Sequence, residues 1–160
     1  EMLQPSLHGA WNVVSPGFVA QETIRYESTA RRYEPGALNL PGIVGMVASM
    51  ELLMECGIEA IGERLLKLRD AMLVQLHALG FRGIVDTVDN VDALRGGSSG
   101  IVTVTHPAKD MKALFKQLDA NGVTASLRQD RKGTMYIRFS PHFYNTEEEI
   151  ERICEILRAN

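Results

Sequence analysis

The feature that most restricts the fold is a change of hydrophobic periodicity near residue 80. Before it, apolar residues recur at steps of three and four, which is the period of an α-helix. After it, short runs rich in β-branched residues alternate with helical stretches. The resulting order of strand, strand, helix, strand, strand, helix predicts an α+β fold, in which a small, mostly antiparallel sheet is covered by helices.

Two helices are expected before this change. The first covers residues 43–54, and its apolar residues occupy most of the helix circumference, so we expect it to be buried on more than one side. The second covers residues 58–79 and carries a single apolar stripe with charged residues opposite to it. That stripe consists of Ile61, Leu65, Leu68, Met72, Leu76 and Leu79.

The remaining elements are bounded by turn and capping residues. Strands are expected at residues 81–88, 101–105, 123–128 and 135–139. The last two are joined as a hairpin by the turn at residues 130–133. One helix is expected to open at Pro107, and the last begins at Thr146, because Thr146 and Glu149 match the T-x-x-E capping box.

The first 41 residues differ from the rest, because they show no clear periodicity and are interrupted by proline and glycine. They are nevertheless rich in aromatic and aliphatic residues, so we expect them to pack against another surface. We therefore divide the chain into an extended arm at residues 1–41, and a linking helix with an α+β domain at residues 42–160. Since Glu1 lies in such an arm, we expect a longer parent protein.

The composition narrows the class of protein. Apolar residues make up 45% and charged residues 23% of the chain, which is typical of globular proteins. No apolar run reaches the roughly 18 residues of a membrane span, and a net charge of −3 argues against nucleic-acid binding. We interpret Cys56 and Cys154 as buried free thiols, which favours the cytoplasm. The histidines are too scattered for a metal site: His8, His77, His106 and His142.

The most informative segment for function is the strand and loop at residues 136–146. Arg138 lies between Ile137 and Phe139, so strand alternation directs its side chain away from the face that these two occupy. A guanidinium group is a rigid cationic fork that binds a carboxylate through two hydrogen bonds. The alternative is an arginine on a solvated sheet face.

A second candidate segment, residues 31–39, precedes the first expected helix. Gly36 allows the backbone to approach a ligand closely, and the amide of Asn39 can donate a hydrogen bond. The alternative is an ordinary turn before a helix.

Together, the two segments resemble the class V aminotransferase family of fold-type I pyridoxal-phosphate enzymes, which includes cysteine desulfurases and isopenicillin N epimerase-like proteins. In that family a stretch similar to R-R-Y-E-P-G-A-L-N-L-P-G leads into the helix between the large and small domains. An arginine strand and helix cap similar to I-R-F-S-P-H-F-Y-N-T follow later. The two motifs occur here in the family's order and at the family's distance, and the resemblance covers essentially the whole chain.

The resemblance implies the C-terminal, small domain of such an enzyme, with pyridoxal 5'-phosphate as cofactor, an amino acid as substrate and a homodimer as assembly. It implies that Arg138 binds the substrate α-carboxylate, and that the segment with Gly36, Ala37 and Asn39 reaches the cofactor phosphate of the other subunit. Ala37 replaces the family's Thr or Ser, so that contact would rest on backbone N–H groups or on Asn39. Arg128 is a further candidate for substrate binding, with a surface hairpin residue as the alternative.

In relatives, the lysine that carries the cofactor and the aspartate that pairs with its pyridine nitrogen lie upstream of the part that this chain resembles. No residue of this chain is therefore expected to be catalytic, and the isolated chain is expected to be inactive. The lysines present match no catalytic position: Lys67, Lys109, Lys112, Lys116 and Lys132.

The loop at residues 127–133 lacks the cysteine of desulfurases, which disfavours persulfide chemistry and favours the epimerase- and lyase-like branch. We predict a parent enzyme that acts at Cα of an amino acid, by transamination, lyase or epimerase chemistry. The alternative is a non-catalytic α+β binding or dimerisation module.

Overall fold

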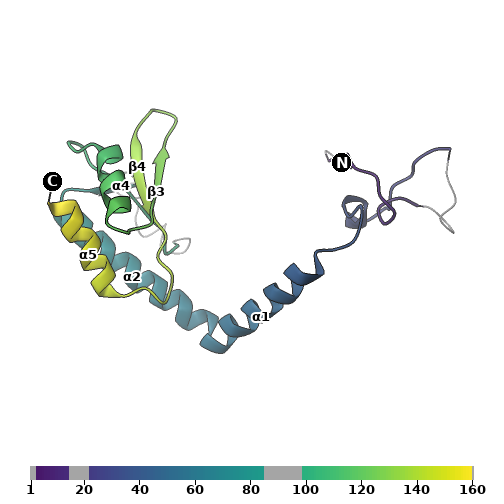
Figure 1. Ribbon diagram of the computed structural model, residues 1–160, viewed down its shortest axis with the longest axis horizontal. Coiled ribbons are helices and arrows are strands. Elements are labelled where there is room, and N and C mark those ends of the chain that lie inside the picture. Colours follow the sequence, from purple (N-terminus) through teal and green to yellow (C-terminus); the bar gives the residue numbers. More distant parts are fainter. Residues whose placement is uncertain (1–2, 15–21, 85–98, 160) are drawn as a thin grey trace. The chain divides into compact units, whose positions relative to one another are not determined.

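The computed structural model describes residues 3–14, 22–84 and 99–159, and it divides into two compact units, Glu1–Leu53 and Met54–Asn160. Helix α1, Leu40–Cys56, runs across the division between them (Figure 1). The domain boundary that we expect between residues 41 and 42 stays a prediction.

The second unit contains a four-stranded antiparallel sheet with the order β1-β2-β4-β3. This confirms the predicted α+β class and the order of elements. The last residues of the first expected strand, 85–88, lie outside the described part of the chain. The strands are β1 Arg82–Gly83, β2 Val102–Thr105, β3 Ser126–Gln129 and β4 Met135–Phe139.

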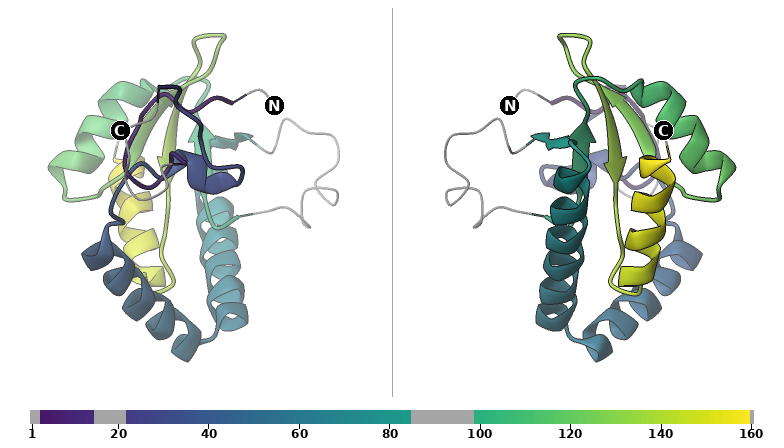
Figure 2. Two further views of the ribbon diagram at one scale, coloured as in Figure 1. Left: turned by 90° about the vertical axis from the view of Figure 1, so that its right-hand side faces the viewer. Right: turned by 90° about the vertical axis from the view of Figure 1, so that its left-hand side faces the viewer.

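Three helices of this unit form the second layer: α2 Ile58–Ala78, α4 Met111–Ala120 and α5 Glu147–Arg158. Helix α5 packs against both α2 and α4, and Figure 2 shows α2 and α5 running side by side. The core lies between the helices and one face of the sheet, because the inward strand residues and the helix stripes are buried together. Its members include Leu68, Met72, Leu76, Val102, Val104, Leu114, Leu118, Ile137, Phe139, Ile150, Cys154 and Leu157.

Helix α4 begins four residues after the predicted start, so the expectation at Pro107 was wrong. Asp110 is the N-cap residue, and its carboxylate accepts hydrogen bonds from the backbone N–H groups of Lys112 and Ala113. A side chain that satisfies two free N–H groups fixes the helix start more strongly than a proline does.

The capping box of α5 is confirmed. The hydroxyl of Thr146 accepts from the N–H of Glu149 at 3.3 Å, and the carboxylate of Glu149 accepts from the N–H of Thr146 at 3.0 Å. The guanidinium of Arg64 on α2 donates to both carboxylate oxygens of Glu147, at 2.5 and 2.9 Å, and to the carbonyl of Asn145 at 2.8 Å. These bonds fix the loop after β4 to both helices.

The ion pair between Arg64 and Glu147 predicts a loss of stability in acid. The hydrogen bond from Arg64 lowers the pKa of Glu147 from 4.5 to about 2. A lowered pKa in the folded state means that the stabilisation is complete above pH 4.5 and is lost as the pH falls towards 2.

The free energy of unfolding of wild type should therefore exceed that of Glu147→Gln at pH 6, and the difference should shrink below pH 4.5. Urea titrations at several pH values measure this difference, and a gap that is constant with pH would contradict the assignment. Glu155→Gln, on an exposed part of the same helix, is the matched control.

Two sequence expectations about burial were wrong. No residue of α1 is buried, although we expected this helix to be buried on more than one side. Cys56, its last residue, is exposed, whereas Cys154 is buried as expected. The reason is the same for both, because the part of the chain that the structure describes supplies no surface that covers α1. None of the helices described is both long enough and apolar enough to cross a lipid bilayer.

Candidate functional site

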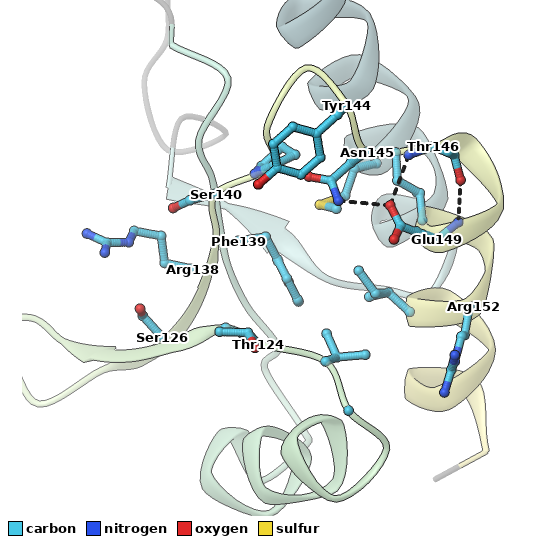
Figure 3. Close-up of a pocket in the computed structure, with 17 residues that line it drawn as sticks. Thr124, Ser126, Arg138, Phe139, Ser140, Tyr144, Asn145, Thr146, Glu149 and Arg152 are labelled. Carbon is cyan, nitrogen blue, oxygen red and sulfur yellow. Dashed lines mark hydrogen bonds between the residues drawn. The ribbon is translucent and has the colours of Figure 1, made fainter. Parts of the chain in front are cut away.

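Arg138 projects from the face of the sheet that the helices leave open. Its neighbours in β4, Ile137 and Phe139, are 0% and 3% exposed and face the helices, and Arg138 is half-buried on the other side. Figure 3 shows Arg138 and Phe139 leaving β4 in opposite directions, with Ser126 on the side of Arg138. In the sheet register Arg138 pairs with Thr103 of β2 and with Ser126 of β3.

The guanidinium of Arg138 has no partner within the described residues. Its Nε atom is buried from solvent and has no hydrogen-bond acceptor. An unsatisfied buried donor costs free energy, on the order of 1–3 kcal/mol. A salt bridge would give Arg138 a structural role. Among the described residues, the salt bridges join Arg64 to Glu147 and Arg69 to Asp70, and Arg138 takes part in neither.

A pocket of about 530 Å³ adjoins Arg138 at the end of β4. Its walls come from the start of β3, the loop after β4 and the first turns of α5, as Figure 3 shows. The Asn145 side chain shapes this loop, because it accepts from the N–H of His142 at 2.7 Å and donates to Glu149 at 2.8 Å. Asn145 and Thr146 of the sequence motif thus have an evident structural role, since they hold the loop that follows Arg138.

Arg128 lies on the same face of the sheet as Arg138. Arg128 pairs with Tyr136, and Ser126 pairs with Arg138. Since side chains alternate along a strand, residues two positions apart point to the same face. Its guanidinium is exposed and donates only a long bond of 3.4 Å to the carbonyl of Leu127. The hairpin that follows it is confirmed, since the N–H of Asp130 donates to the carbonyl of Thr134 at 3.0 Å, and Gly133 adopts a φ of 87°.

The second candidate segment lies in the first unit, where Asn12 holds it. The side chain of Asn12 is 1% exposed and donates to the carbonyls of Leu7 and Arg32, at 2.8 and 2.9 Å. Its oxygen accepts from the N–H of Gly9 at 2.9 Å. Asn12 therefore joins the start of the arm to the 3₁₀ helix η2, Ala30–Tyr33.

Gly9 makes the tightest approach of the arm to this segment. A Cβ atom at Gly9 would lie 1.8 Å from the carbonyl oxygen of Pro35 and 2.6 Å from its carbonyl carbon. Both are backbone atoms, so only glycine allows this packing. The position of the turn that contains Gly36 thus depends on the first residues of the arm.

Gly36, Ala37 and Asn39 are all exposed, and they directly precede α1. The side-chain oxygen of Asn39 accepts from the N–H of Gly42 at 3.1 Å, so Asn39 caps the helix and presents its amide N–H₂ group as a donor. The backbone N–H groups of residues 36, 37 and 39 have no acceptor among the residues that the structure describes. The segment therefore presents several exposed N–H groups that bind no protein acceptor, and such groups can donate hydrogen bonds to an anion.

Sequence reasoning missed Asn12 and Gly9, which position this segment. No local pattern marks them, because the partners of Asn12 include the carbonyl of Arg32, twenty residues away, and Gly9 contacts Pro35. The structure leaves the two candidate sites in separate units, with Arg138 in the second and residues 36–39 in the first. Across the described ranges, no group of three or more His, Cys, Asp or Glu residues could hold a metal ion.

Comparisons with known proteins match almost the whole chain. The family model described as aminotransferase class-V matches residues 1–153. The probable cysteine desulfurase of Methanothermobacter thermautotrophicus is 24% identical over 169 aligned residues, which cover 97% of this chain and 39% of the relative.

Solved structures show the same fold. An apo cysteine desulfurase from Thermococcus onnurineus NA1 superposes with a TM-score of 0.78 at 18% identity, over 98% of this chain and 39% of that protein. The cysteine desulfurase CsdA from Escherichia coli gives 0.72 at 18% identity, over 97% and 38%. The chain thus spans about 39% of the length of these relatives. On the match over residues 1–153, the chain belongs to the class V aminotransferase family.

Proposed function

We propose that this chain is the C-terminal part of a pyridoxal-phosphate enzyme that acts at Cα of an amino acid. In this proposal Arg138 binds the substrate α-carboxylate, and residues 36–39 bind the cofactor phosphate within a homodimer. The observation that carries it is the buried Nε of Arg138 without a partner, on a strand of the family's fold.

A carboxylate suits Arg138 better than other anions for a geometric reason. Two parallel N–H bonds of a guanidinium match the two oxygens of a carboxylate, and such bonds are about twice as strong as neutral ones. The hydroxyls of Thr103 and Ser126 flank Arg138 in the register and provide further polar contacts. Arg138 would thereby fix the orientation of the substrate's Cα, which decides the bond that reacts.

The donors at residues 36–39 fit the phosphate of the cofactor. Backbone N–H groups without a protein acceptor, together with the side-chain N–H₂ of Asn39, can donate to the phosphate. The side-chain oxygen of Asn39 already accepts from the N–H of Gly42. These donors replace the hydroxyl that Ala37 lacks. When bound, pyridoxal phosphate supplies the electron sink for the carbanion at Cα. Within the described chain, residues 36–39 would hold its phosphate and Arg138 would orient the substrate.

The lysines of this chain do not lie on the sheet face of Arg138. Lys67 is on α2, Lys112 and Lys116 are on α4, and Lys132 is in the hairpin turn. Lys109 donates to the carbonyl of Leu157 at 2.9 Å. We infer that the lysine that carries the cofactor belongs to another part of a longer protein, and that the 160-residue chain alone is inactive.

The relatives are named cysteine desulfurases, whereas the sequence of residues 127–133 disfavours persulfide chemistry. The hairpin contains no cysteine, Cys154 is buried in the core, and burial raises the pKa of its thiol. Neither the hairpin nor Cys154 therefore places a thiol nucleophile beside Arg138. We therefore propose chemistry at Cα without a persulfide, that is, transamination, lyase or epimerase chemistry.

Cofactor binding tests the role of residues 36–39. In the full-length protein, Asn39→Leu should weaken the binding of pyridoxal phosphate about tenfold, because a donor to a dianion is lost. The measurement is a titration followed by the absorbance of the bound cofactor. Glu51→Gln, which replaces an exposed carboxylate elsewhere on α1 by a neutral amide, is the control and should change the affinity less than twofold. An unchanged affinity for Asn39→Leu, or no cofactor band in wild type, would overturn the proposal.

A further inference from the structure

The open face of the sheet carries arginines on three of its strands. Register and alternation place Arg82 of β1, Arg128 of β3 and Arg138 of β4 on this face, with the helices covering the other. Within the paired strand residues, the rest of this face is polar: Thr103, Thr105, Ser126 and Tyr136. In the part of the chain that the structure describes, none of the three arginines forms an ion pair.

Among the described residues, the carboxylate of Asp130 lies beside this face, where it contacts Tyr136. The Asp130 carboxylate accepts from the N–H groups of Lys132 and Thr134, both at 2.8 Å, and from the hydroxyl of Tyr136 at 3.2 Å. These bonds hold Asp130 in the hairpin, and no salt bridge joins it to Arg128 in the described chain, so three arginines stand against this one carboxylate. The face thus retains a positive charge that is suited to an anionic ligand.

Arg128 and Arg138 are spaced for one small ligand. They are diagonal neighbours on adjacent antiparallel strands, and such positions lie about 7–8 Å apart between Cα atoms. Their long side chains can converge on two acidic groups of a single molecule. Arg82 is on β1, with β2 between it and β4, so it is farther from Arg138.

From this placement we propose that Arg128 binds a second acidic group, so that the substrate is an α-amino acid whose side chain ends in a carboxylate. The inference rests on the proposed role of Arg138 in binding the α-carboxylate. Arg128 is then a specificity-determining residue, because a neutral side chain would leave its charge without a partner. A site built for a charged group discriminates strongly against analogues that lack it.

The test uses glutarate and pentanoate, two five-carbon acids that differ by one carboxylate. Their dissociation constants are measured by calorimetry on the full-length protein loaded with pyridoxal phosphate. Wild type should bind glutarate more tightly than pentanoate. Arg128→Gln should weaken glutarate about tenfold and change pentanoate less than twofold, since one charge-assisted contact is lost. Arg128→Lys, which keeps the charge, should retain part of the preference.

Two further variants separate this inference from the proposed function. Arg138→Gln should weaken both acids, and if it weakens neither, the proposed carboxylate site fails. Arg82→Gln removes an equal charge from the same face and should change neither acid more than twofold. If Arg82→Gln and Arg128→Gln weaken glutarate equally, the face acts only through its net charge and the inference is overturned. It is also overturned if wild type does not prefer glutarate, or if Arg128→Gln leaves glutarate unchanged.

Discussion

Replacing Arg138 by glutamine in the full-length protein should raise the KM for the amino-acid substrate about 100-fold, because two charge-assisted hydrogen bonds to the carboxylate are lost. Steady-state kinetics with the natural substrate measure this effect. If Arg138 also fixes the position of Cα, kcat falls as well, so kcat/KM decreases more than KM alone indicates.

The free energy of unfolding of Arg138→Gln distinguishes a role of Arg138 in substrate binding from a role in stabilising the fold. Since Nε of Arg138 has no partner in the described chain, its removal breaks no hydrogen bond of the folded state. Arg138→Gln should therefore not lower the free energy of unfolding by more than about 1 kcal/mol, and relief of the unsatisfied donor can raise it. Arg138→Lys is the matched variant, because it keeps the charge but loses the two-pronged geometry, and it should show an intermediate KM. A destabilised variant with an unchanged KM would indicate a structural role instead.

Replacing Gly9 by alanine should detach the arm from the segment at residues 31–39. The new methyl group would lie 1.8 Å from the carbonyl oxygen of Pro35, and neither backbone can yield without losing the bonds of Asn12. Overpacking of this kind costs on the order of 3 kcal/mol. Faster hydrogen exchange at Arg31, Arg32 and Glu34, whose N–H groups are hydrogen-bonded, would report the detachment. In the full-length protein, weaker binding of pyridoxal phosphate should accompany it.

The control for this experiment is Gly45→Ala. Gly45 lies in α1, and a Cβ atom there would meet nothing within 4 Å. Alanine should stabilise the helix by roughly 0.5–1 kcal/mol, because glycine is the poorer helix former. If the backbone amides of the segment exchange in Gly9→Ala at the wild-type rate, the close approach of Gly9 and Pro35 does not hold the segment in place.

Local signals predicted much of the second unit. The capping box of Thr146 and Glu149, the hairpin at residues 130–133 and the stripe of α2 each depend on residues a few positions apart. The energies that decide these features act within one turn or one hairpin, so the sequence shows them directly. The prediction that α1 is buried failed for the opposite reason. An apolar helix surface indicates that something should cover it, but it does not indicate which surface does so.

For the candidate site, the sequence by itself determined that Arg138 faces away from Ile137 and Phe139, because alternation is a property of a single strand. Gly36 and Asn39 marked residues 31–39 as a candidate segment, but the resemblance supplied its phosphate-binding role and the substrate-binding role of Arg128. Those roles stay predictions.

Only the tertiary structure decided which residues share the face of Arg138. The order β1-β2-β4-β3 places β4 between β2 and β3, and the register then puts Arg128 diagonal to Arg138. Likewise, Asn12 and Gly9 act through partners far along the chain. Hydrogen-bond register and backbone contacts between distant segments depend on how the whole unit packs, and no local pattern of residues encodes them.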